Sequence, residues 1–451
     1  MNIIIVGAGA VGAAICQRLA EEKHDITLID ESEAAINEVV NNTDVIGLVG
    51  NGASVPLLKK AEAEKADLII AVTGSDELNI LCCAAAKRLG TTHKIARVRN
   101  PAYAELISFM RKDTTLSMTI NPELAVAKEI YRTLRFPSAA KIEIFAHGRA
   151  ELAEYVVPAS SPICGLTLND LRAKLGLMFL VCAVLRDGEA HVPSGSFVIE
   201  AGDVIGITAR EEELNKFFKE IGAYVSPVKN VLIMGGSRTT YYLESLLQRS
   251  KISSTVIEKN KQQCHGLAEA FDCTVVCDDG TKQDVLLEEG VDRTDAFIAL
   301  SDTDEENAIV SLFASKQGAK KVITKINSMP YIDLFKEMGL ESVVCPKIST
   351  TAYILRYVRA LSGAQGSEIE SLHKLMDGKI EALEFIIKED IAGITGIPLK
   401  DLKLRKGIII ACLVRGDKLI IPTGTDEIAA GDTVLTVSAN KQINSIKEIL
   451  S

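Results

Sequence analysis

Short apolar runs alternate with amphipathic stretches along the first part of the chain. The runs lie at residues 2–6, 26–29, 45–49, 68–72 and 95–98. They are rich in Ile, Val and Leu without polar alternation, which is typical of strands buried on both faces. Helical patterns lie between them, as at residues 10–22 and 77–89. Because strands that alternate with helices pair in parallel, the pattern predicts a doubly wound, Rossmann-like sheet.

A smaller module with a different pattern follows the first one. Its strand-like runs lie at residues 153–157, 179–185 and 203–208, and its helix-like stretches at 168–175 and 211–221. The helices do not separate every pair of strands, as they do in the first module. This mixture predicts a small α+β domain and leaves its topology open.

The chain then repeats both modules. The apolar run that ends in Gly7 returns, 228 residues later, in the run that ends in Gly235. The same offset joins Asp30 to Glu258, Gly52 to Gly280, Asp67 to Asp295, Asp76 to Asp304, Asn79 to Asn307, Arg97 to Lys325 and Tyr103 to Tyr331. An offset of 229 joins Arg186, Pro193 and Gly202-Asp203 to Arg415, Pro422 and Gly431-Asp432. A register held over about a hundred residues indicates that each half begins with the same folded unit.

The fold class that follows is α/β, with two Rossmann-like doubly wound parallel-sheet domains, each followed by a small α+β domain. The expected domains are residues 1–135, 143–224, 228–362 and 371–451. Turn-forming residues mark the breaks between these domains at 136–138, 225–227 and 362–366.

Composition narrows the class of protein. The 451 residues are 47% hydrophobic and 24% charged, which excludes a mostly disordered chain. A net charge of −10 argues against nucleic acid and anionic lipid as partners, because both require a basic surface. No apolar run reaches the roughly 18 residues of a membrane span, and no basic leader precedes the first strand. We therefore expect a cytoplasmic protein without direct membrane insertion, which reaches a membrane only through a protein partner.

Cysteines and histidines lack the spacing of metal or catalytic sites. The ten cysteines include the pair Cys82-Cys83 and the trio Cys264, Cys273 and Cys277, but they form no CxxC pair. We expect them to be buried, reduced thiols. The six histidines have no metal-ligand spacing, and the GxSxG, Walker A and HExxH motifs do not occur. The sequence therefore predicts no catalytic residues and no metal site.

A glycine-rich turn is the strongest local signal. It reads Gly7-Ala8-Gly9-Ala10-Val11-Gly12, and it ends the first strand and opens a helix. In such a turn Gly7 permits the tight bend, Gly9 lets the backbone approach a pyrophosphate, and Gly12 lets the helix pack close to the sheet. The helix N-terminus adds free amides and positive potential. The motif predicts a nucleotide-binding loop, with a turn that binds no ligand as the alternative.

Further candidate ligands for a nucleotide lie at the carboxyl ends of the later strands, where doubly wound sheets bind their ligands. Asp30 ends the second strand, where a carboxylate accepts hydrogen bonds from ribose hydroxyls and disfavours a 2′-phosphate. NAD or an adenine nucleotide is therefore favoured over NADP. The following loops contribute Asn51, Gly52, Thr73 and Gly74.

Two arginines complete the predicted site. Arg97 and Arg99 are expected on alternate positions of a strand, so that both guanidiniums point to one face. Two guanidiniums at one edge suit a di- or triphosphate better than a nicotinamide ring. The alternative is a pair of salt bridges to carboxylates such as Asp76 and Glu77.

The second half keeps the frame of this site but loses part of the motif. Its candidate residues are Gly235, Ser237, Arg238, Glu258 and Lys325. Ser237 and Thr240 replace the second and third glycines, and we expect them to crowd a pyrophosphate and to hold the helix away from the strand. The second site is either a modified nucleotide site with weak or altered binding or a decayed structural copy.

The combined motifs resemble a known family. They are Gly7-Ala8-Gly9, Asp30, Gly50-Asn51-Gly52, Thr73-Gly74-Ser75-Asp76-Glu77-Leu78-Asn79 and Arg97-Val98-Arg99-Asn100-Pro101. They resemble the RCK (KTN) domains that regulate potassium transport. Their tandem arrangement in one chain is similar to the TrkA-type subunits of Trk potassium uptake systems. The likeness covers nearly the whole chain, and it is more specific in the parallel-sheet domains than in the small ones.

The resemblance implies a function. In that family the larger subdomain binds NAD(H) or ATP/ADP, which implies nucleotide contacts for Gly7, Gly9, Gly12, Asp30, Thr73 and Arg97, with Arg99 as a second phosphate ligand for ATP. It implies a homo-oligomer, a dimer or tetramer that forms an RCK ring. It also implies a TrkH- or TrkG-like integral membrane potassium translocator as partner, with the chain at the inner face of the cell membrane. The expected function is therefore nucleotide-dependent regulation without catalysis.

Two other functions are consistent with parts of the sequence. An NAD-dependent oxidoreductase would explain the glycine motif and Asp30, but not the complete duplication or the missing acid–base residues. A structural scaffold with vestigial sites is opposed by the intact first glycine motif. The sequence does not rank the nucleotides.

Overall fold

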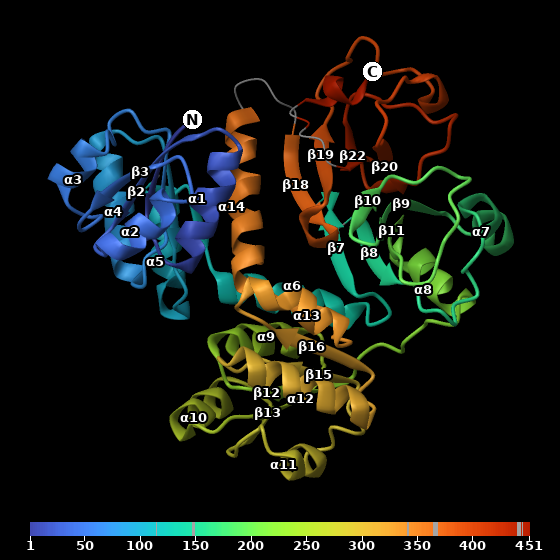
Figure 1. Cartoon of the computed structure of the whole chain (residues 1–451), viewed down its shortest axis with the longest axis horizontal. Helices are drawn as coiled ribbons and strands as arrows, with labels where there is room; N and C mark the ends of the chain where they lie inside the picture. The colour runs from blue at the N-terminus through green and yellow to red at the C-terminus, as the bar shows by residue number, and fades with distance from the viewer. Residues whose placement is uncertain (114, 147–148, 341, 364–368, 440–442, 444) are drawn as a thin grey trace.

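Parallel and antiparallel sheets alternate along the chain, as a computed structural model shows (Figure 1). The structure describes all residues except 114, 147–148, 341, 364–368, 440–442 and 444. Each parallel sheet with its helices forms a separate lobe, and the two antiparallel sheets lie together in a third. Within the described residues, every helix is too short or too polar to cross a lipid bilayer.

The first parallel sheet has the strand order β3-β2-β1-β4-β5-β6, which is the Rossmann order. Its strands are β1 (Asn2–Val6), β2 (Asp25–Asp30), β3 (Ile46–Val49), β4 (Leu68–Ala71), β5 (His93–Arg97) and β6 (Met118–Ile120). Its helices are α1 (Ala10–Glu21), α2 (Glu33–Val40), α3 (Val55–Lys60), α4 (Asp76–Leu89), α5 (Ala104–Lys112) and α6 (Pro122–Arg135). The predicted doubly wound sheet is confirmed.

The central strand β1 shows why this part of the sequence lacks polar alternation. Ile3 and Ile5 face the core that includes Ile15 of α1, whereas Ile4 on the opposite face joins the core that includes Cys82 of α4. Because helices cover both faces of the sheet, successive residues from Ile3 to Val6 face different apolar cores, and all four are buried.

The second parallel sheet repeats the first, with the order β14-β13-β12-β15-β16-β17. Its strands are β12 (Asn230–Met234), β13 (Ser253–Ile257), β14 (Thr274–Val276), β15 (Ala296–Ala299), β16 (Lys321–Lys325) and β17 (Ser342–Val344). Its helices are α9 (Arg238–Arg249), α10 (Lys261–Ala270), α11 (Gln283–Glu288), α12 (Asp304–Gln317), α13 (Ile332–Glu337) and α14 (Pro346–Gly363). The predicted repeat of the parallel-sheet domain is therefore confirmed.

Two helices are exchanged between the halves. Helix α6 places Val126 and Ile130 in the core of the second parallel sheet, beside Leu243 of α9. Helix α14 in turn places Ile354 and Val358 in the core of the first sheet. Figure 1 shows α14 standing against α1 and α6 lying over α9. Each half therefore completes the core of the other.

Each antiparallel sheet follows one parallel sheet. The first, ordered β10-β9-β11-β8-β7, contains β7 (Lys141–Phe145), β8 (Ala150–Val156), β9 (Phe179–Arg186), β10 (Glu189–His191) and β11 (Val204–Ala209), with α7 (Leu168–Leu175) and α8 (Glu211–Glu220). The second, ordered β18-β19-β22-β20-β21, contains β18 (Ile369–Leu375), β19 (Ile380–Ile386), β20 (Ile408–Arg415), β21 (Lys418–Ile420) and β22 (Asp432–Ala439). The predicted small domain after each parallel sheet is confirmed, and among the described residues the second one has 3₁₀ turns where the first has α7 and α8. The sequence pattern did not reveal the strands β6, β7 and β10.

The two antiparallel sheets share one core. It joins Phe145 and Leu152 of the first sheet to Ile380 and Leu435 of the second. Repeated ion pairs support both sheets at their edges: Asp203, which is buried, binds Arg186 with both carboxylate oxygens at 2.7 Å, and Asp432 binds Arg415 at 2.7 and 2.8 Å. The Gly-Asp turns of the sequence therefore enter strands, as expected, and also fix an arginine.

One local prediction is wrong. Strand β5 ends at Arg97, so Arg99 lies beyond the strand and not on its alternate face. Helix α14 continues through Gly363, and the rest of the break expected near 362–366 lies outside the described part of the chain, so this break stays a prediction. The helix continues because its apolar residues pack on the first parallel sheet, which local turn preferences do not reveal.

Candidate functional site

The three glycines of the first loop have different surroundings. Gly7 has φ +109°, in the left-handed region that favours glycine, and a Cβ there would lie 3.0 Å from the amide nitrogen of Thr73. At Gly12 a Cβ would lie 1.8 Å from the carbonyl oxygen of Gly7. Gly9 faces open space, with no atom within 4 Å of a Cβ built there. Gly7 and Gly12 therefore make the turn, and Gly9 leaves room for a ligand.

The N-terminus of α1 opens into that space. Gly9 is its N-cap, and no side chain caps the helix. Ala10 is exposed and Val11 is half-buried at the start of the helix. The first amides of a helix carry partial positive charge and have no partner within the helix, so this end can bind an anion.

Asp30 fixes the loop from the neighbouring strand. Its carboxylate accepts a hydrogen bond from the amide of Ala8 at 2.7 Å and another from the amide of Ser32 at 2.8 Å. Both oxygens keep free lone pairs, because a carboxylate offers about four acceptor sites. Asp30 therefore positions the glycine loop and can still accept hydrogen bonds from a ribose.

Asn51 and Gly52 shape the loop after β3. The Asn51 side chain accepts a hydrogen bond from the amide of Ala53 at 2.8 Å, which makes a local turn. A Cβ at Gly52 would lie 2.1 Å from the Val6 side chain, so a larger residue does not fit there. Asn51 therefore stabilises the turn after β3, and Gly52 lets this turn pack against Val6.

Thr73 and Gly74 form the loop after β4, and a buried asparagine organises it. Asn79 accepts hydrogen bonds from the amide and the hydroxyl of Thr73, both at 2.7 Å, and donates to the carbonyl of Arg97 at 2.9 Å. The hydroxyl hydrogen of Thr73 is thereby used, so this oxygen can offer a ligand only its lone pairs. A Cβ at Gly74 would meet open space.

Arg97 and Arg99 both reach this loop. The guanidinium of Arg97 donates to the carbonyl of Thr73, and that of Arg99 donates to the carbonyl of Gly74 at 2.5 Å. Arg99 also forms an ion pair with Asp76, whose carboxylate lies 3.3 Å from Nε of Arg99. The same carboxylate accepts a hydrogen bond from the backbone amide of Arg99 at 2.8 Å. The salt-bridge alternative therefore holds for Arg99 and Asp76, while both guanidiniums stay close to the loop.

The electrostatics of this edge favour an anion. Burial, and then the charge of Arg99, lower the pKa of the Arg97 guanidinium. Its Nε atom is buried without a hydrogen-bond partner among the described residues. A phosphate close to both guanidiniums would offset the repulsion between the two cations.

The corresponding loop of the second half is altered. Gly235 keeps φ +101°, but Thr240 is fully buried and donates its hydroxyl to the Gly235 carbonyl. Since a Cβ at the equivalent Gly12 would clash with the loop, α9 must lie further from its loop than α1 does. Ser237 caps α9 only through its backbone, and Arg238 is exposed at the first helical position.

Glu258 and Lys325 occupy the positions of Asp30 and Arg97. Glu258 accepts hydrogen bonds from the amides of Gly236 and Asn260, both at 2.6 Å, as Asp30 does from its own loop. Lys325 is buried and pairs with Asp302 at 3.3 Å. The frame of the first site is therefore present, with a different charge pattern.

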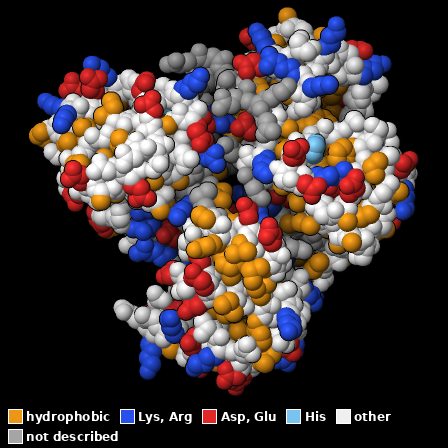
Figure 2. Space-filling view, in the orientation of Figure 1, with side chains coloured by type: hydrophobic (Ala, Val, Ile, Leu, Met, Phe, Trp, Pro, Cys, Tyr) orange, Lys and Arg blue, Asp and Glu red, His pale blue; other side chains and the backbone are white. Residues whose placement is uncertain are grey.

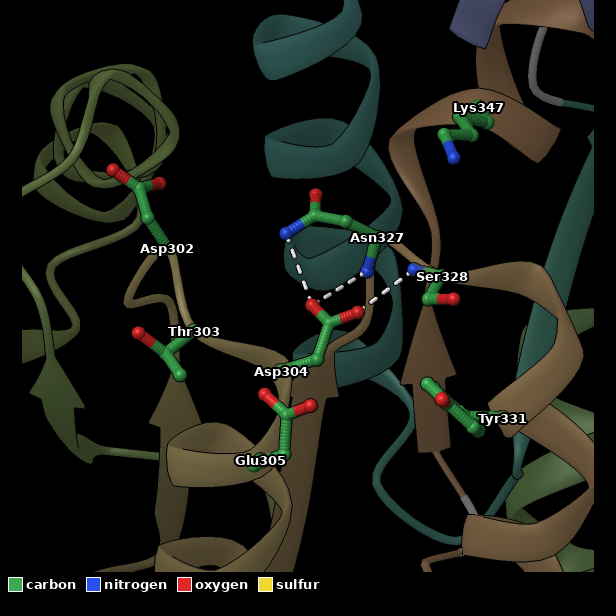
Figure 3. Close-up of a pocket in the computed structure, with 8 residues that line it drawn as sticks. All are labelled: Asp302, Thr303, Asp304, Glu305, Asn327, Ser328, Tyr331 and Lys347. Atoms are coloured by element: carbon green, nitrogen blue, oxygen red, sulfur yellow. Dashed lines mark hydrogen bonds between the residues drawn. The ribbon is translucent and has the colours of Figure 1, made fainter.

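A cavity of about 360 Å³ opens beside Lys325, lined by Asp302, Thr303, Asp304, Glu305, Asn327, Ser328, Tyr331 and Lys347 (Figure 3). Figure 3 shows Asp304 turned toward Asn327 and Ser328. Its carboxylate accepts hydrogen bonds from the backbone amides of these two residues at 2.8 and 2.7 Å, respectively. In the repeat, Asp302 replaces Gly74 and Asn327 replaces Arg99. This edge has gained a carboxylate and lost a guanidinium, so it attracts phosphate less than the first edge does.

The chain matches two family models, each of them twice. The TrkA-N domain matches residues 3–118 and 231–346, and the TrkA-C domain matches residues 152–222 and 384–451. The chain belongs to the TrkA family. It is 32% identical over 457 residues to the Trk system potassium uptake protein TrkA homolog 1 of Methanosarcina mazei, covering 99% of each chain. It is 30% identical over 457 residues to TrkA of Vibrio alginolyticus, covering 100% of this chain and 98% of that one.

Solved structures share the TrkA-type fold of the chain. The GsuK channel bound to NAD superimposes with a TM-score of 0.63 at 17% identity, over 97% of this chain and 77% of that one. The GsuK RCK domain superimposes with a TM-score of 0.61 at 17% identity, over 97% and 92%. At this identity the likeness establishes the RCK fold, as the sequence motifs predicted.

Two functional features of this TrkA-family chain escaped the sequence reasoning. Asn79 builds the Thr73 loop, and its repetition at offset 228 is the signal that could have revealed this role. Tyr242 of α9 donates its hydroxyl to the carbonyl of Arg99 at 2.6 Å, across the two halves. No local pattern predicts that contact, because it depends on the exchanged helices.

The described part of this TrkA-family chain contains no group of three or more His, Cys, Asp or Glu side chains that could hold a metal ion. The residues brought together at the first loop are backbone amides, one carboxylate and two guanidiniums. Such groups bind and orient a ligand.

Proposed function

We propose that this chain is a nucleotide-sensing regulatory subunit of a Trk-type potassium uptake system and catalyses no reaction. The observation that carries the proposal is the open first glycine loop. There the uncapped N-terminus of α1 and the unfilled space at Gly9 lie at the edge of the sheet that also bears Asp30 and Arg97. Membership of the TrkA family supports potassium transport as the regulated process.

An adenine nucleotide is the ligand class that fits this site, either NAD or NADH, or ATP or ADP. The carboxylate of Asp30 suits ribose hydroxyls and opposes a 2′-phosphate, and the two guanidiniums suit a di- or triphosphate. The GsuK channel, which shares the fold, has structures bound to NAD and to ADP. The loop amides at residues 7–12 would hold the phosphates, with Thr73, Arg97 and Arg99 at the other side.

The second loop is proposed to bind more weakly than the first. Thr240 widens the spacing of helix and loop, and Asp302 brings a negative charge to the phosphate side. Gly235, Ser237, Arg238, Glu258 and Lys325 would be the residues in contact with a ligand there.

Helix α1 connects the first loop to the rest of the molecule. Its amino end opens at Gly9, and the residue after its carboxyl end, Glu22, binds Arg359 of α14. Arg359 also pairs with Glu381 of β19 at 3.4 Å. A nucleotide that prefers one position of α1 would therefore shift the antiparallel lobe as well, and about 1–3 kcal/mol of such coupling changes gating several-fold. The moving units are proposed to be the domains 1–135, 143–224, 228–362 and 371–451, except that α6 and α14 move with the opposite cores that they complete.

The nucleotide-dependent conformational change is proposed to regulate a TrkH- or TrkG-like membrane translocator. The chain would lie in the cytoplasm at the inner face of the membrane. The chain would form a homo-oligomeric RCK ring, as a dimer or tetramer. Exposed apolar residues support assembly: Figure 2 shows them gathered over α12 and α13, where Ile309, Leu334 and Met338 are exposed. The equivalent face of the first half exposes Leu81 and Leu106.

Potassium uptake tests this function directly. In a host without its own uptake systems, the chain and its membrane partner should restore growth at limiting potassium, whereas Asp30→Ala should restore it poorly. Asp25→Ala is the matched control, because it removes an exposed carboxylate from the opposite end of the same strand. Equal growth with wild type and Asp30→Ala would contradict regulation through this loop. An NAD-dependent substrate oxidation by the purified chain would favour the oxidoreductase instead.

A further inference from the structure

Three cysteines lie in the second parallel-sheet domain, at positions where the same fold in the first half has other residues. Cys264 lies on α10, Cys273 immediately precedes β14, and Cys277 immediately follows it. The offset of 228 places Ile36, Val45 and Val49 at these positions in the first half, respectively. Since aliphatic side chains serve the same frame there, the thiols are specific to the second half.

Two of these thiols meet beside Glu258. The Cys264 thiol donates to the Glu258 carbonyl at 3.1 Å. The Glu258 amide donates to the Val276 carbonyl at 3.0 Å, so Cys277 is the next residue along the strand edge. In the register of β13 and β14, Ile257 lies opposite Val276, so Cys277 lies beside Glu258, the residue whose carbonyl Cys264 contacts. Cys273 lies at the opposite end of the short strand β14, away from this pair.

The two thiols differ in access to solvent. Cys264 is buried, with 7% of its surface exposed, whereas Cys277 is exposed. Burial, and then the neighbouring Cys277 thiol, raise the pKa of the Cys264 thiol to about 11. Because the thiolate is the nucleophile, an oxidant in solution reaches and reacts with Cys277 first.

We propose that Cys264 and Cys277 are an oxidisable thiol pair that closes to a disulfide beside the second glycine loop. With hydrogen peroxide as oxidant, the Cys277 thiol takes one oxygen atom to become a sulfenic acid and one water molecule leaves. The Cys264 sulfur then displaces the hydroxyl group from the Cys277 sulfur, which forms the S–S bond and releases a second water. In total, two thiols lose two electrons and two protons, and one peroxide becomes two waters.

The disulfide would act on the loop through Glu258. The carboxylate of Glu258 holds the amides of Gly236 and Asn260, so it joins the glycine loop to the start of α10. A bond between Cys264 and Cys277 ties that same start of α10 to the end of β14. Oxidation therefore stiffens the second loop, and the first half, with Ile36 and Val49, does not respond.

Mass spectrometry of the full-length protein tests the pair without reference to nucleotide. The protein is exposed to hydrogen peroxide, its remaining thiols are blocked, and it is digested without reduction by a protease that cleaves after Glu269 and Asp272. These cuts separate Cys264 from Cys273 and Cys277. We expect one cross-linked pair of peptides, lighter by about 2 Da than the sum of the free peptides, that dithiothreitol separates.

Matched serine variants identify the partners. Cys273→Ser should form the same cross-link at the wild-type rate, whereas Cys277→Ser should form none and leave Cys264 unmodified. A serine at the exposed position 277 is expected to leave folding intact, which circular dichroism checks. A cross-link to Cys273, an unchanged cross-link in Cys277→Ser, or oxidation of Cys277 to the sulfinic acid without any cross-link would each overturn the proposal.

Discussion

At the scale of single residues, the first glycine motif combines two structural positions with one open position. Gly7 and Gly12 lie against neighbouring backbone atoms, and Gly9 faces empty space at a φ of −65° that any residue adopts. The spacing GxGxxG correctly predicted the tight turn at Gly7 and the close packing at Gly12, whereas the approach of a ligand at Gly9 stays a prediction. An added methyl group would clash with the backbone at Gly12 but not at Gly9, and the free energy of unfolding measures this difference.

Gly12→Ala should destabilise the protein, because the added Cβ would lie 1.8 Å from a backbone oxygen and α1 would have to move. Overpacking of this kind costs about 1–3 kcal/mol of the free energy of unfolding. Gly9→Ala is the matched control and should unfold like the wild type. Urea denaturation followed by circular dichroism compares the two. Equal midpoints for both variants would show that α1 does not pack closely on its loop.

The arginines show where residue-level reasoning from sequence is incomplete. Residue type and position predicted two guanidiniums at the loop, and the structure places both there. The expected alternation along a strand was wrong, because β5 ends at Arg97 and the backbone of Arg99 is bound by Asp76. A buried carboxylate from another element redirected the chain, and strand periodicity carries no information about such a contact.

At the scale of elements, the apolar runs predicted five strands of the first parallel sheet and the three central strands of the first antiparallel sheet, and they missed the short edge strand β6. The missed strand β7 (Lys141–Phe145) alternates polar and apolar residues, and β10 (Glu189–His191) is short and polar. Such edge strands are defined by their neighbours in the sheet, so their local pattern is weak.

A buried carboxyl on β8 should make stability depend on pH. Burial, and then the negative charge of Glu211 on α8, raise the pKa of Glu151 from 4.5 to about 7. Because its folded-state pKa lies above the unfolded value, Glu151 favours folding when protonated, and this contribution is lost as the pH rises from about 4.5 to 7. Glu151→Gln should therefore stabilise the protein at pH 8, on the order of 1 kcal/mol, and have little effect at pH 4.5.

Urea midpoints at the two pH values measure this effect. The matched control is Glu212→Gln, which removes a charge from α8 at an exposed position. If Glu151→Gln destabilised the protein equally at both pH values, the carboxyl would be hydrogen-bonded and charged, contrary to the account.

Tyr242 on α9 links the second parallel-sheet domain to the first loop. Tyr242→Phe removes the hydroxyl that donates to the Arg99 carbonyl at 2.6 Å, and should cost about 1 kcal/mol of the free energy of unfolding. The neighbouring Tyr241→Phe is the control, since the Tyr241 ring packs on Phe271 with centroids 4.7 Å apart and is partly exposed. Thermal unfolding distinguishes them. A larger loss for Tyr241→Phe would contradict a specific bridge through Tyr242.

At the scale of the whole molecule, the duplication makes the two halves interdependent. Helices α6 and α14 leave their own sheets and complete the opposite cores, and the antiparallel sheets share a third core. The repeat in the sequence predicted two similar halves. It could not predict the exchange, because an amphipathic helix shows an apolar face without identifying the surface that covers it.

The exchange predicts how the chain behaves when it is divided. Residues 1–224 and 228–451, produced together as separate chains, should form a stable one-to-one complex, because each half supplies a helix to the other. Size-exclusion chromatography with light scattering measures the complex. Ile354→Asp, which places a charge in the core beneath α1, should weaken it. Two soluble halves that do not associate would contradict the shared cores.

Calorimetric titration of the full chain with NADH, NAD, ATP and ADP tests the central claim most directly, and Gly9→Ala is the decisive variant. A methyl group at Gly9 would meet no neighbouring atom and would occupy the space proposed for phosphate. The account predicts that adenine nucleotides bind the wild type, with the tightest site lost in Gly9→Ala by tenfold or more, a loss on the order of 1.4 kcal/mol. Wild-type protein that binds none of the four, or a Gly9→Ala variant that binds them equally, would contradict a nucleotide site at the first loop.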